Sequence, residues 1–197
     1  MGHIAKILHF AIKAKCCIAK KCNTLAYKRI CLYIWGKLEY MPRAMKHITL
    51  DTPIGRLLVG IEESKVTSIA ITDENHPHSP IPSKDFEKQI AKELEEYFNG
   101  ERREFSFPIK PKGSPFQMAV WKELQQIPYG STATYGEIAA RIGNPKASRA
   151  VGMACNRNPI LVAVPCHRVV GGNGKLTGFA AGTDKKEILL KLENSKF

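Results

Sequence analysis

The most informative stretch of this chain is Ile160-Leu-Val-Ala-Val-Pro165-Cys166-His167-Arg168-Val169-Val170-Gly171-Gly172. Its five leading apolar residues predict a buried strand, and Pro165 predicts a turn directly after it. Burying the thiol, imidazole and guanidinium that follow is costly unless they have a role. A cysteine beside two groups that can be cationic is expected to have a lowered thiol pKa, and the thiolate is the nucleophilic form. Cys166 is therefore predicted to be a reactive cysteine.

Charge and cysteines are unevenly distributed along the 197 residues. The net charge of +12 suggests an anionic partner, but residues 1–44 hold nine Lys or Arg residues against one acid, Glu39. The case for nucleic-acid binding therefore rests on local features. Four of the six cysteines also lie in residues 1–44, which leaves Cys155 and Cys166 for the rest of the chain. A working thiol needs a reducing compartment, so a cytoplasmic protein is expected.

Residues 1–44 are interpreted as a basic, cysteine-containing extension that is disordered or not native, with Met45 as the ordinary start. A basic amphipathic segment that touches membrane or nucleic acid is the alternative. No apolar run approaches the ~18 residues of a membrane-spanning helix, so no membrane partner is expected.

From residue 45 to 112 the pattern predicts a small α/β domain. Strands are expected at 47–50, 56–61, 66–71 and 103–109. Ser83 is expected to cap a helix that ends at Asn99-Gly100, with Phe86, Ile90, Leu94, Tyr97 and Phe98 as its apolar stripe.

Residues 113–197 are predicted to be mainly helical. Ser114 with Gln117, and Thr134 with Glu137, form capping-box pairs. Gly143-Asn144-Pro145 ends the second of these helices, and a third then places Ala147, Ala150, Val151 and Ala154 on one side. The pair is typical of a helix-turn-helix. Asp184 is expected to cap a closing helix that buries Ile188, Leu189 and Leu192.

Several motifs in order resemble one family. They are Ser114-Pro115-Phe116-Gln117, Ile127-Pro128-Tyr129-Gly130, Tyr135-Gly136-Glu137-Ile138-Ala139, residues 143–152, Asn158-Pro159 and Pro165-Cys166-His167-Arg168-Val169. Together they resemble the O6-alkylguanine-DNA alkyltransferases, the methylated-DNA–protein-cysteine methyltransferases. The resemblance implies an α/β ribonuclease-H-like scaffold domain followed by a helix-turn-helix, winged-helix-like DNA-binding domain that carries the active site.

The resemblance also implies a reaction. Cys166 would take the alkyl group in a single, stoichiometric turnover, as a suicide enzyme. His167 would accept the thiol proton through a water, because adjacent side chains on an extended segment point to opposite faces. Glu193 would orient His167, and Asn158 would fix the active-site turn. Tyr135 would crowd the phosphate and donate a hydrogen bond to the leaving guanine.

The partner implied by the resemblance is double-stranded DNA that contains O6-alkylguanine, with O4-alkylthymine as a further candidate, bound by a monomer. The helix from Ala147 to Ala154 would enter the minor groove with its small side chains. Ala147, Ser148, Ala150 and Gly152 would lie against the DNA with Tyr135. Arg149 would fill the stack that the flipped base leaves.

The base pocket implied by the resemblance consists of Cys155, Leu161, Val169, Phe179 and Ala180. Some relatives have Tyr and Ser at positions 179 and 180 and Pro at position 161, and these changes affect tolerance for bulky alkyl groups in a direction that the sequence does not fix. The mechanism needs no cofactor and no metal. The scaffold domain has His47, His76 and His78 but no cysteine, so a zinc site is not expected.

Three other functions stay open at this point. A lesion-binding protein without transfer activity would lack the cysteine, which is present here as Cys166. A helix-turn-helix regulator could use the thiol as a sensor, although no response domain is visible. A cysteine hydrolase would need an oxyanion hole, and nothing else in the sequence indicates one.

Overall fold

The computed structural model describes residues 46–72 and 84–193. The described residues belong to one compact unit of the chain, which begins at Met45. Ser83, His76, His78 and residues 1–44 lie outside the described residues. Within the described part of the chain, no helix is long and apolar enough to cross a membrane.

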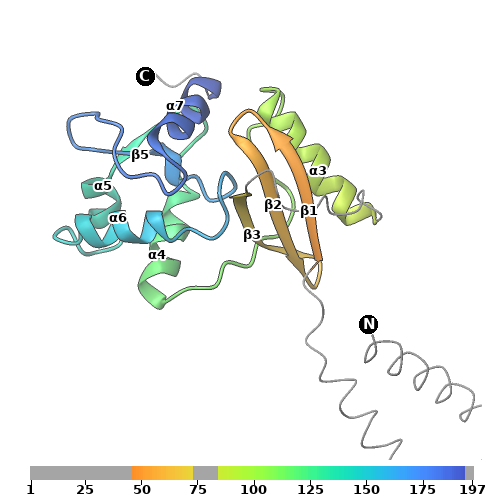
Figure 1. The fold of residues 1–197 in the computed structure, drawn as a ribbon. Helices are drawn as coiled ribbons and strands as arrows, with labels where there is room; N and C mark the ends of the chain where they lie inside the picture. The colour runs from red at the N-terminus through yellow and green to blue at the C-terminus, as the bar shows by residue number, and fades with distance from the viewer. Residues whose placement is uncertain (1–45, 73–83, 194–197) are drawn as a thin grey trace, which may run out of the picture. The chain divides into compact units, whose positions relative to one another are not determined.

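The first half of the unit is an antiparallel sheet with one helix packed against it (Figure 1). The strands β1 (Lys46–Thr52), β2 (Gly55–Glu62) and β3 (Lys65–Thr72) lie in the order β1-β2-β3. The helix α3 (Asp85–Phe98) buries Ile90, Leu94, Tyr97 and Phe98, as its apolar stripe predicts. The three predicted strands and this helix are confirmed, but the N-cap of the helix is Lys84 rather than the predicted Ser83.

The fourth predicted strand, at 103–109, is wrong. Only Ile109 pairs, in an isolated parallel bridge with Val66. The Val66 N–H donates to the Pro108 carbonyl at 2.9 Å, and the Lys110 N–H donates to the Val66 carbonyl at 2.8 Å. The prolines at positions 108 and 111 lack an N–H, so this segment cannot extend into a regular ladder.

The second half is mainly helical, with α4 (Pro115–Leu124), α5 (Tyr135–Arg141), α6 (Ser148–Asn156) and α7 (Thr183–Leu192). The predicted capping boxes at Ser114 and Thr134 are both present. Trp121 is buried and its indole N–H donates to the Ala154 carbonyl at 2.9 Å, which fixes α4 against α6. The strands β4 (Ala133–Thr134) and β5 (Val169–Val170) form a short parallel pair.

Two helix faces differ from their predicted arrangement. Ala150 was expected on the buried side of α6 but is exposed. On α7 the N-cap is Gly182 rather than Asp184, and Ile188 is 39% exposed. The buried face of α7 instead contains Lys186, Leu189 and Leu190.

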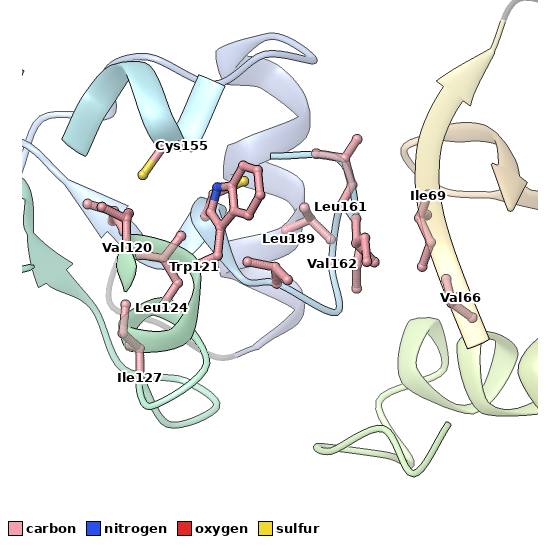
Figure 2. Close-up of a cluster of buried hydrophobic side chains, with 14 of the residues drawn as sticks. Val66, Ile69, Val120, Trp121, Leu124, Ile127, Cys155, Leu161, Val162 and Leu189 are labelled. Atoms are coloured by element: carbon pink, nitrogen blue, oxygen red, sulfur yellow. The ribbon is translucent and has the colours of Figure 1, made fainter. Parts of the chain in front are cut away.

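The segment that precedes Cys166 joins the two halves along the outer edge of β3. The Ile69 N–H donates to the Pro159 carbonyl at 2.9 Å, and the Leu161 N–H donates to the Ile69 carbonyl at 3.0 Å. Figure 2 shows Leu161 and Val162 between Ile69 and Val66 of β3 and the cluster around Trp121. One hydrophobic core therefore supports both the sheet and the reactive segment.

Candidate active site

Asn158 shapes the segment that leads to Cys166. Its Oδ1 accepts a hydrogen bond from the Ile160 N–H at 3.0 Å. Its Nδ2 donates to the Val164 carbonyl at 2.7 Å and to Cys166 Sγ at 3.1 Å. Since one side chain binds both ends of residues 160–164, the segment folds back on itself. The predicted strand at 160–164 is therefore wrong, and only Ile160 makes a bridge.

Val162 is strained within this turn. It has a φ of 70°, a conformation that a β-branched residue rarely adopts. The Ala163 N–H donates to the Leu161 carbonyl at 2.8 Å across it, which closes a γ-turn. Such strain costs about 1–3 kcal/mol and persists only where the surrounding structure holds it. Here the bonds of Asn158 and the pairing with Ile69 hold it, which places Cys166 at a defined position.

Cys166 begins a 3-10 turn, Cys166–Arg168, and is 2% exposed. Burial raises the pKa of the Cys166 thiol to about 11, although the hydrogen bond from Asn158 and the positive charge of Lys186 act in the opposite sense. The expected lowered thiol pKa is therefore wrong, because the loss of hydration outweighs the nearby cation. At neutral pH the group is a thiol and needs a base in order to react. The sequence-based argument for His167 assumed an extended segment. The 3-10 turn shows that this assumption is wrong.

His167, the next residue along the chain, is the candidate for that base. Its side chain is fully buried, and Nε2 lies 3.0 Å from Glu193 Oε1. Burial lowers the pKa of His167, and the cations Arg168 and Lys186 act in the same sense, whereas Glu193 opposes them. The imidazole is thus neutral at pH 7, and the contact with the carboxylate assigns its proton to Nε2. Nδ1 is the buried side-chain polar atom without a hydrogen-bond partner in the described residues, so its lone pair is free to accept a proton.

Glu193 accepts hydrogen bonds from two side chains besides His167 and from one backbone amide. Arg168 donates to Oε2 from Nε and to Oε1 from Nη2, both at 2.9 Å. The Tyr97 hydroxyl donates to Oε1 at 2.5 Å, and the Gly130 N–H donates to Oε2 at 3.3 Å. Burial alone would raise the pKa of Glu193, but the hydrogen bonds from His167, Arg168 and Tyr97 hold it at about 2. Glu193 is therefore a permanently charged anchor for His167.

Tyr135 stands at the first position of α5, between α6 and the loop before α7. A Cβ added at Gly152 would lie 3.8 Å from the Tyr135 ring. The hydroxyl donates to the carbonyls of Thr177, at 2.8 Å, and Gly178, at 3.2 Å. Burial, together with the charges that Cys155 and Cys166 would carry, raises the pKa of Tyr135 to about 12, so the hydroxyl is a donor at all ordinary pH values.

Lys186 is a site residue that the sequence analysis missed. Its side chain is fully buried, and Nζ donates to the carbonyls of Val169, at 2.6 Å, and Thr177, at 2.9 Å. Burial lowers the pKa of Lys186, while the charges that Cys166 and Cys155 would carry raise it. The periodicity of α7 could have revealed this residue, because Lys186, Leu189, Leu190 and Glu193 follow i, i+3, i+4 and i+7 spacing.

The predicted DNA-facing residues divide by exposure. Arg149 and Ala150 are exposed, and Ser148 and Gly152 are half-buried. Ala147 is 9% exposed and belongs to the core, which agrees with its expected place on the buried side of this helix, and its contact with DNA stays a prediction. Met153, one turn after Arg149, is 58% exposed and is a large apolar residue on the same helix that the sequence analysis did not single out.

The predicted pocket residues do not all line one cavity. Leu161 and Ala180 line a cavity of about 380 Å³ next to Asn158. Its other lining residues are Ile69, Ala70, Ile71, Pro159, Ala181 and Lys185. Cys155 and Val169 are buried and Phe179 is half-buried, and none of the three lines this cavity.

Comparison with known families identifies the chain. The ribonuclease-like domain of 6-O-methylguanine DNA methyltransferase matches residues 45–111, and the DNA binding domain of the same enzyme matches residues 115–195. The chain belongs to the 6-O-methylguanine DNA methyltransferase family. The family resemblance and the prediction of a DNA-repair methyltransferase are confirmed, as is the coarse fold of a ribonuclease-like domain followed by a DNA-binding domain.

Individual relatives of the family agree with this assignment. The methylated-DNA–protein-cysteine methyltransferase of Methanosarcina acetivorans is 48% identical over 155 residues, which is 77% of this chain and 99% of that protein. The constitutive enzyme of Bacillus subtilis is 42% identical over 162 residues, 77% of this chain and 96% of that protein. The crystal structure of Mycobacterium tuberculosis O6-methylguanine methyltransferase is 41% identical with a TM-score of 0.70, over 78% of this chain and 94% of that chain. The Mycobacterium tuberculosis OGT protein in complex with DNA has a TM-score of 0.69 at 42% identity, over 76% of this chain and 92% of that chain.

Proposed function

We propose that this chain repairs duplex DNA by transferring the alkyl group of O6-alkylguanine to Cys166 in a single turnover. The observation that carries the proposal is the arrangement of Cys166, His167 and Glu193. A buried thiol is followed in the chain by a neutral imidazole whose Nδ1 is free and whose Nε2 is fixed on a charged carboxylate at 3.0 Å. A protein that only bound the lesion would have no use for this base.

The first step is removal of the thiol proton. His167 Nδ1 accepts it, through a water where the direct path is too long, and Glu193 stabilises the imidazolium that forms. Asn158 Nδ2 and the Lys186 ammonium favour the developing thiolate. Because the resting pKa of Cys166 is about 11, the thiolate forms only in the presence of this base.

The second step is a single displacement at the alkyl carbon. Cys166 Sγ forms a bond to the carbon as the bond from that carbon to O6 breaks, and the electron pair stays on the guanine. Over the whole reaction the thiol loses one proton and the guanine gains one, so atoms and charge balance. Tyr135 donates a hydrogen bond to the leaving base, for which its hydroxyl has to turn from the carbonyls of Thr177 and Gly178. The product is a stable thioether, so no turnover is expected.

The substrate reaches the thiol by leaving the DNA stack. We assign α6 to the minor groove, with Ser148, Ala150 and Gly152 against the backbone and Arg149 in place of the flipped base. The exposure of Arg149 and Ala150 supports this assignment. O4-alkylthymine is a second substrate candidate, because its alkyl group is attached through an equivalent exocyclic oxygen.

The remaining assignments concern organisation. Residues 45–112 are proposed as the scaffold domain and residues 113–197 as the catalytic, winged-helix-like domain, which the short β4–β5 pair supports. The protein is proposed to act as a monomer in the cytoplasm, where a thiol stays reduced. Neither a cofactor nor a metal takes part in the proposed steps.

The proposal is tested by incubating the full chain with duplex DNA that carries one O6-methylguanine. Intact mass and peptide mapping should show one added methyl group on the Cys166 peptide, and none in Cys166→Ala. Tight binding of the lesion with an unchanged protein mass would refute transfer. The Cys155→Ala variant is the matched control and should still accept one methyl group.

A further inference from the structure

Tyr97 connects the α/β part of the chain to the catalytic carboxylate. It lies on α3 and is fully buried, and its hydroxyl donates to Glu193 Oε1 at 2.5 Å across a separation of 96 residues. The same oxygen faces His167 Nε2 at 3.0 Å. A residue of the scaffold therefore shares the acceptor atom on which the orientation of the base depends.

The ring of Tyr97 is held from several sides. It packs edge-on against Phe98 at 5.3 Å between ring centroids and against Tyr129 at 6.1 Å, and it contacts Phe105 at 5.3 Å. Such contacts give aromatic pairs a defined geometry. Burial and the neighbouring Glu193 hold the pKa of Tyr97 well above its usual range, so its hydroxyl remains a donor. The donor is thus rigid and always protonated.

We propose that Tyr97 is a positioning residue of the transfer reaction, which fixes Glu193 Oε1 against His167 and limits the negative charge that the imidazole experiences. This inference rests on the proposed function, and it gives the scaffold domain a part in the active site. Because Tyr97 is fully buried and bonds to Glu193, it would act through Glu193 and not on the DNA or the alkyl carbon.

Two effects of opposite kind follow from the shared oxygen. The hydrogen bond from Tyr97 holds the carboxylate in place, so its loss loosens His167 and slows transfer. The same bond reduces the negative charge on Glu193 Oε1. Its loss therefore strengthens the attraction between this oxygen and a protonated His167, which raises the pKa of His167. The other charged or titratable groups that face this pair are Arg168, Lys186, Tyr129 and Cys166, and all remain in a variant of Tyr97.

The experiment compares Tyr97→Phe with Tyr129→Phe. Both variants keep an aromatic ring, and both lose a hydroxyl at the end of α7. However, Tyr129 donates to the Leu192 carbonyl at 3.2 Å rather than to the carboxylate. Single-turnover methyl transfer from O6-methylguanine duplex would be followed from about pH 5 to 9, the range in which histidine titrates. Tyr97→Phe is expected to slow transfer on the order of 10-fold, because the carboxylate that orients His167 loses one charge-assisted hydrogen bond, and to move the acid limb of the pH profile to higher pH. Tyr129→Phe should leave the pH profile in place.

A second substitution is expected to shift the acid limb of the pH profile in the opposite direction without removing the hydroxyl. Fluorotyrosine introduced at position 97 keeps both the ring and the hydroxyl, and its more acidic hydroxyl is the stronger donor; urea unfolding checks that the variant folds as the parent does. Its acid limb should move to lower pH. An unchanged pH profile in both Tyr97 variants, with the parent chain active, would overturn the positioning role. Absence of transfer by the parent chain would instead refute the proposed function itself.

Discussion

The buried carboxylate of Glu193, with its hydrogen bonds from His167, Arg168 and Tyr97, is predicted to be one of the largest single contributions to the stability of this fold. The perturbation that tests it is Glu193→Gln, which keeps the shape of the side chain and removes its charge. Glu193 is 1% exposed, and its pKa is about 2 instead of the ordinary 4.5. A lowered carboxyl pKa gives stability that is present above the ordinary pKa and lost as pH falls through the folded value, so the whole contribution is present at pH 7.

The magnitude follows from the two pKa values. Each pH unit between them corresponds to about 1.4 kcal/mol, so the carboxylate contributes about 3 kcal/mol to the free energy of unfolding at pH 7. An independent argument agrees, because removal of one partner of a buried ion pair leaves the other charge uncompensated and costs about 3–5 kcal/mol. In Glu193→Gln the uncompensated group is the Arg168 guanidinium, which is 9% exposed in its side chain.

Urea unfolding at pH 7 measures the effect, with Glu187→Gln as the matched control. Glu187 lies on the same helix and pairs with Lys191 at 2.6 Å, but both side chains are about half exposed, at 47% and 59%. Such a surface pair contributes about 0.5 kcal/mol or less. A loss below about 1 kcal/mol in Glu193→Gln, or an equal loss in the two variants, would show that the burial and hydrogen bonds of Glu193 do not act as argued.

Three further predictions concern the thiol and its neighbours. Asn158→Ala should lower the free energy of unfolding by about 1–3 kcal/mol and slow transfer, because the Val164 carbonyl and the Ile160 N–H lose their buried partner. The control is Asn156→Ala, at an exposed position on α6, and equal behaviour of the two variants would contradict the role of the turn. Labelling of the Cys166 peptide by iodoacetamide should accelerate about tenfold per pH unit up to about pH 10, and a labelling rate already constant at pH 8 would rule out the raised pKa. The stability that the buried thiol form contributes should be lost as pH rises from about 9 to about 11. Lys186→Met should slow transfer on the order of 10-fold, because the positive charge that lowers the thiol pKa is lost. Its free energy of unfolding should be equal or higher, because the buried ammonium is hydrogen-bonded only to carbonyls among the described residues. Lys191→Met, on the exposed face of α7, should change neither, and a fast but unstable Lys186→Met would contradict the reasoning.

The sequence predicted regular elements well where periodicity and capping agree. The apolar stripe of α3 and the capping boxes of α4 and α5 were each sufficient, because these signals act between residues a few positions apart. The predicted strand at 160–164 failed for a reason that periodicity does not contain. An apolar run says that a segment is buried, and the bonds of Asn158 to Ile160 and Val164 decide that it turns.

The active site divides in the same way. Cys166, His167 and Glu193 could be named from the family resemblance, and the structure places His167 on Glu193. The shift of the thiol pKa was predicted in the wrong direction, because neighbouring residues in the sequence show which charges lie near the thiol but not how deeply it is buried. Tyr97 appeared only as a packing residue, because its partner lies 96 positions away.

The pairing of Ile69 with Pro159 and Leu161 also means that the reactive segment covers part of the edge of the sheet. Without it, the N–H and carbonyl of Ile69 would be open to strands from other molecules, which is how exposed sheet edges lead to aggregation, whereas Val66 on the same edge would keep its bonds to Pro108 and Lys110. Any event that separates residues 159–161 from β3 would therefore expose an aggregation-prone strand edge and displace Cys166 at the same time. Solubility and chemical competence are thus linked through a single stretch of backbone, and the hydrogen exchange of the Ile69 amide reports on both.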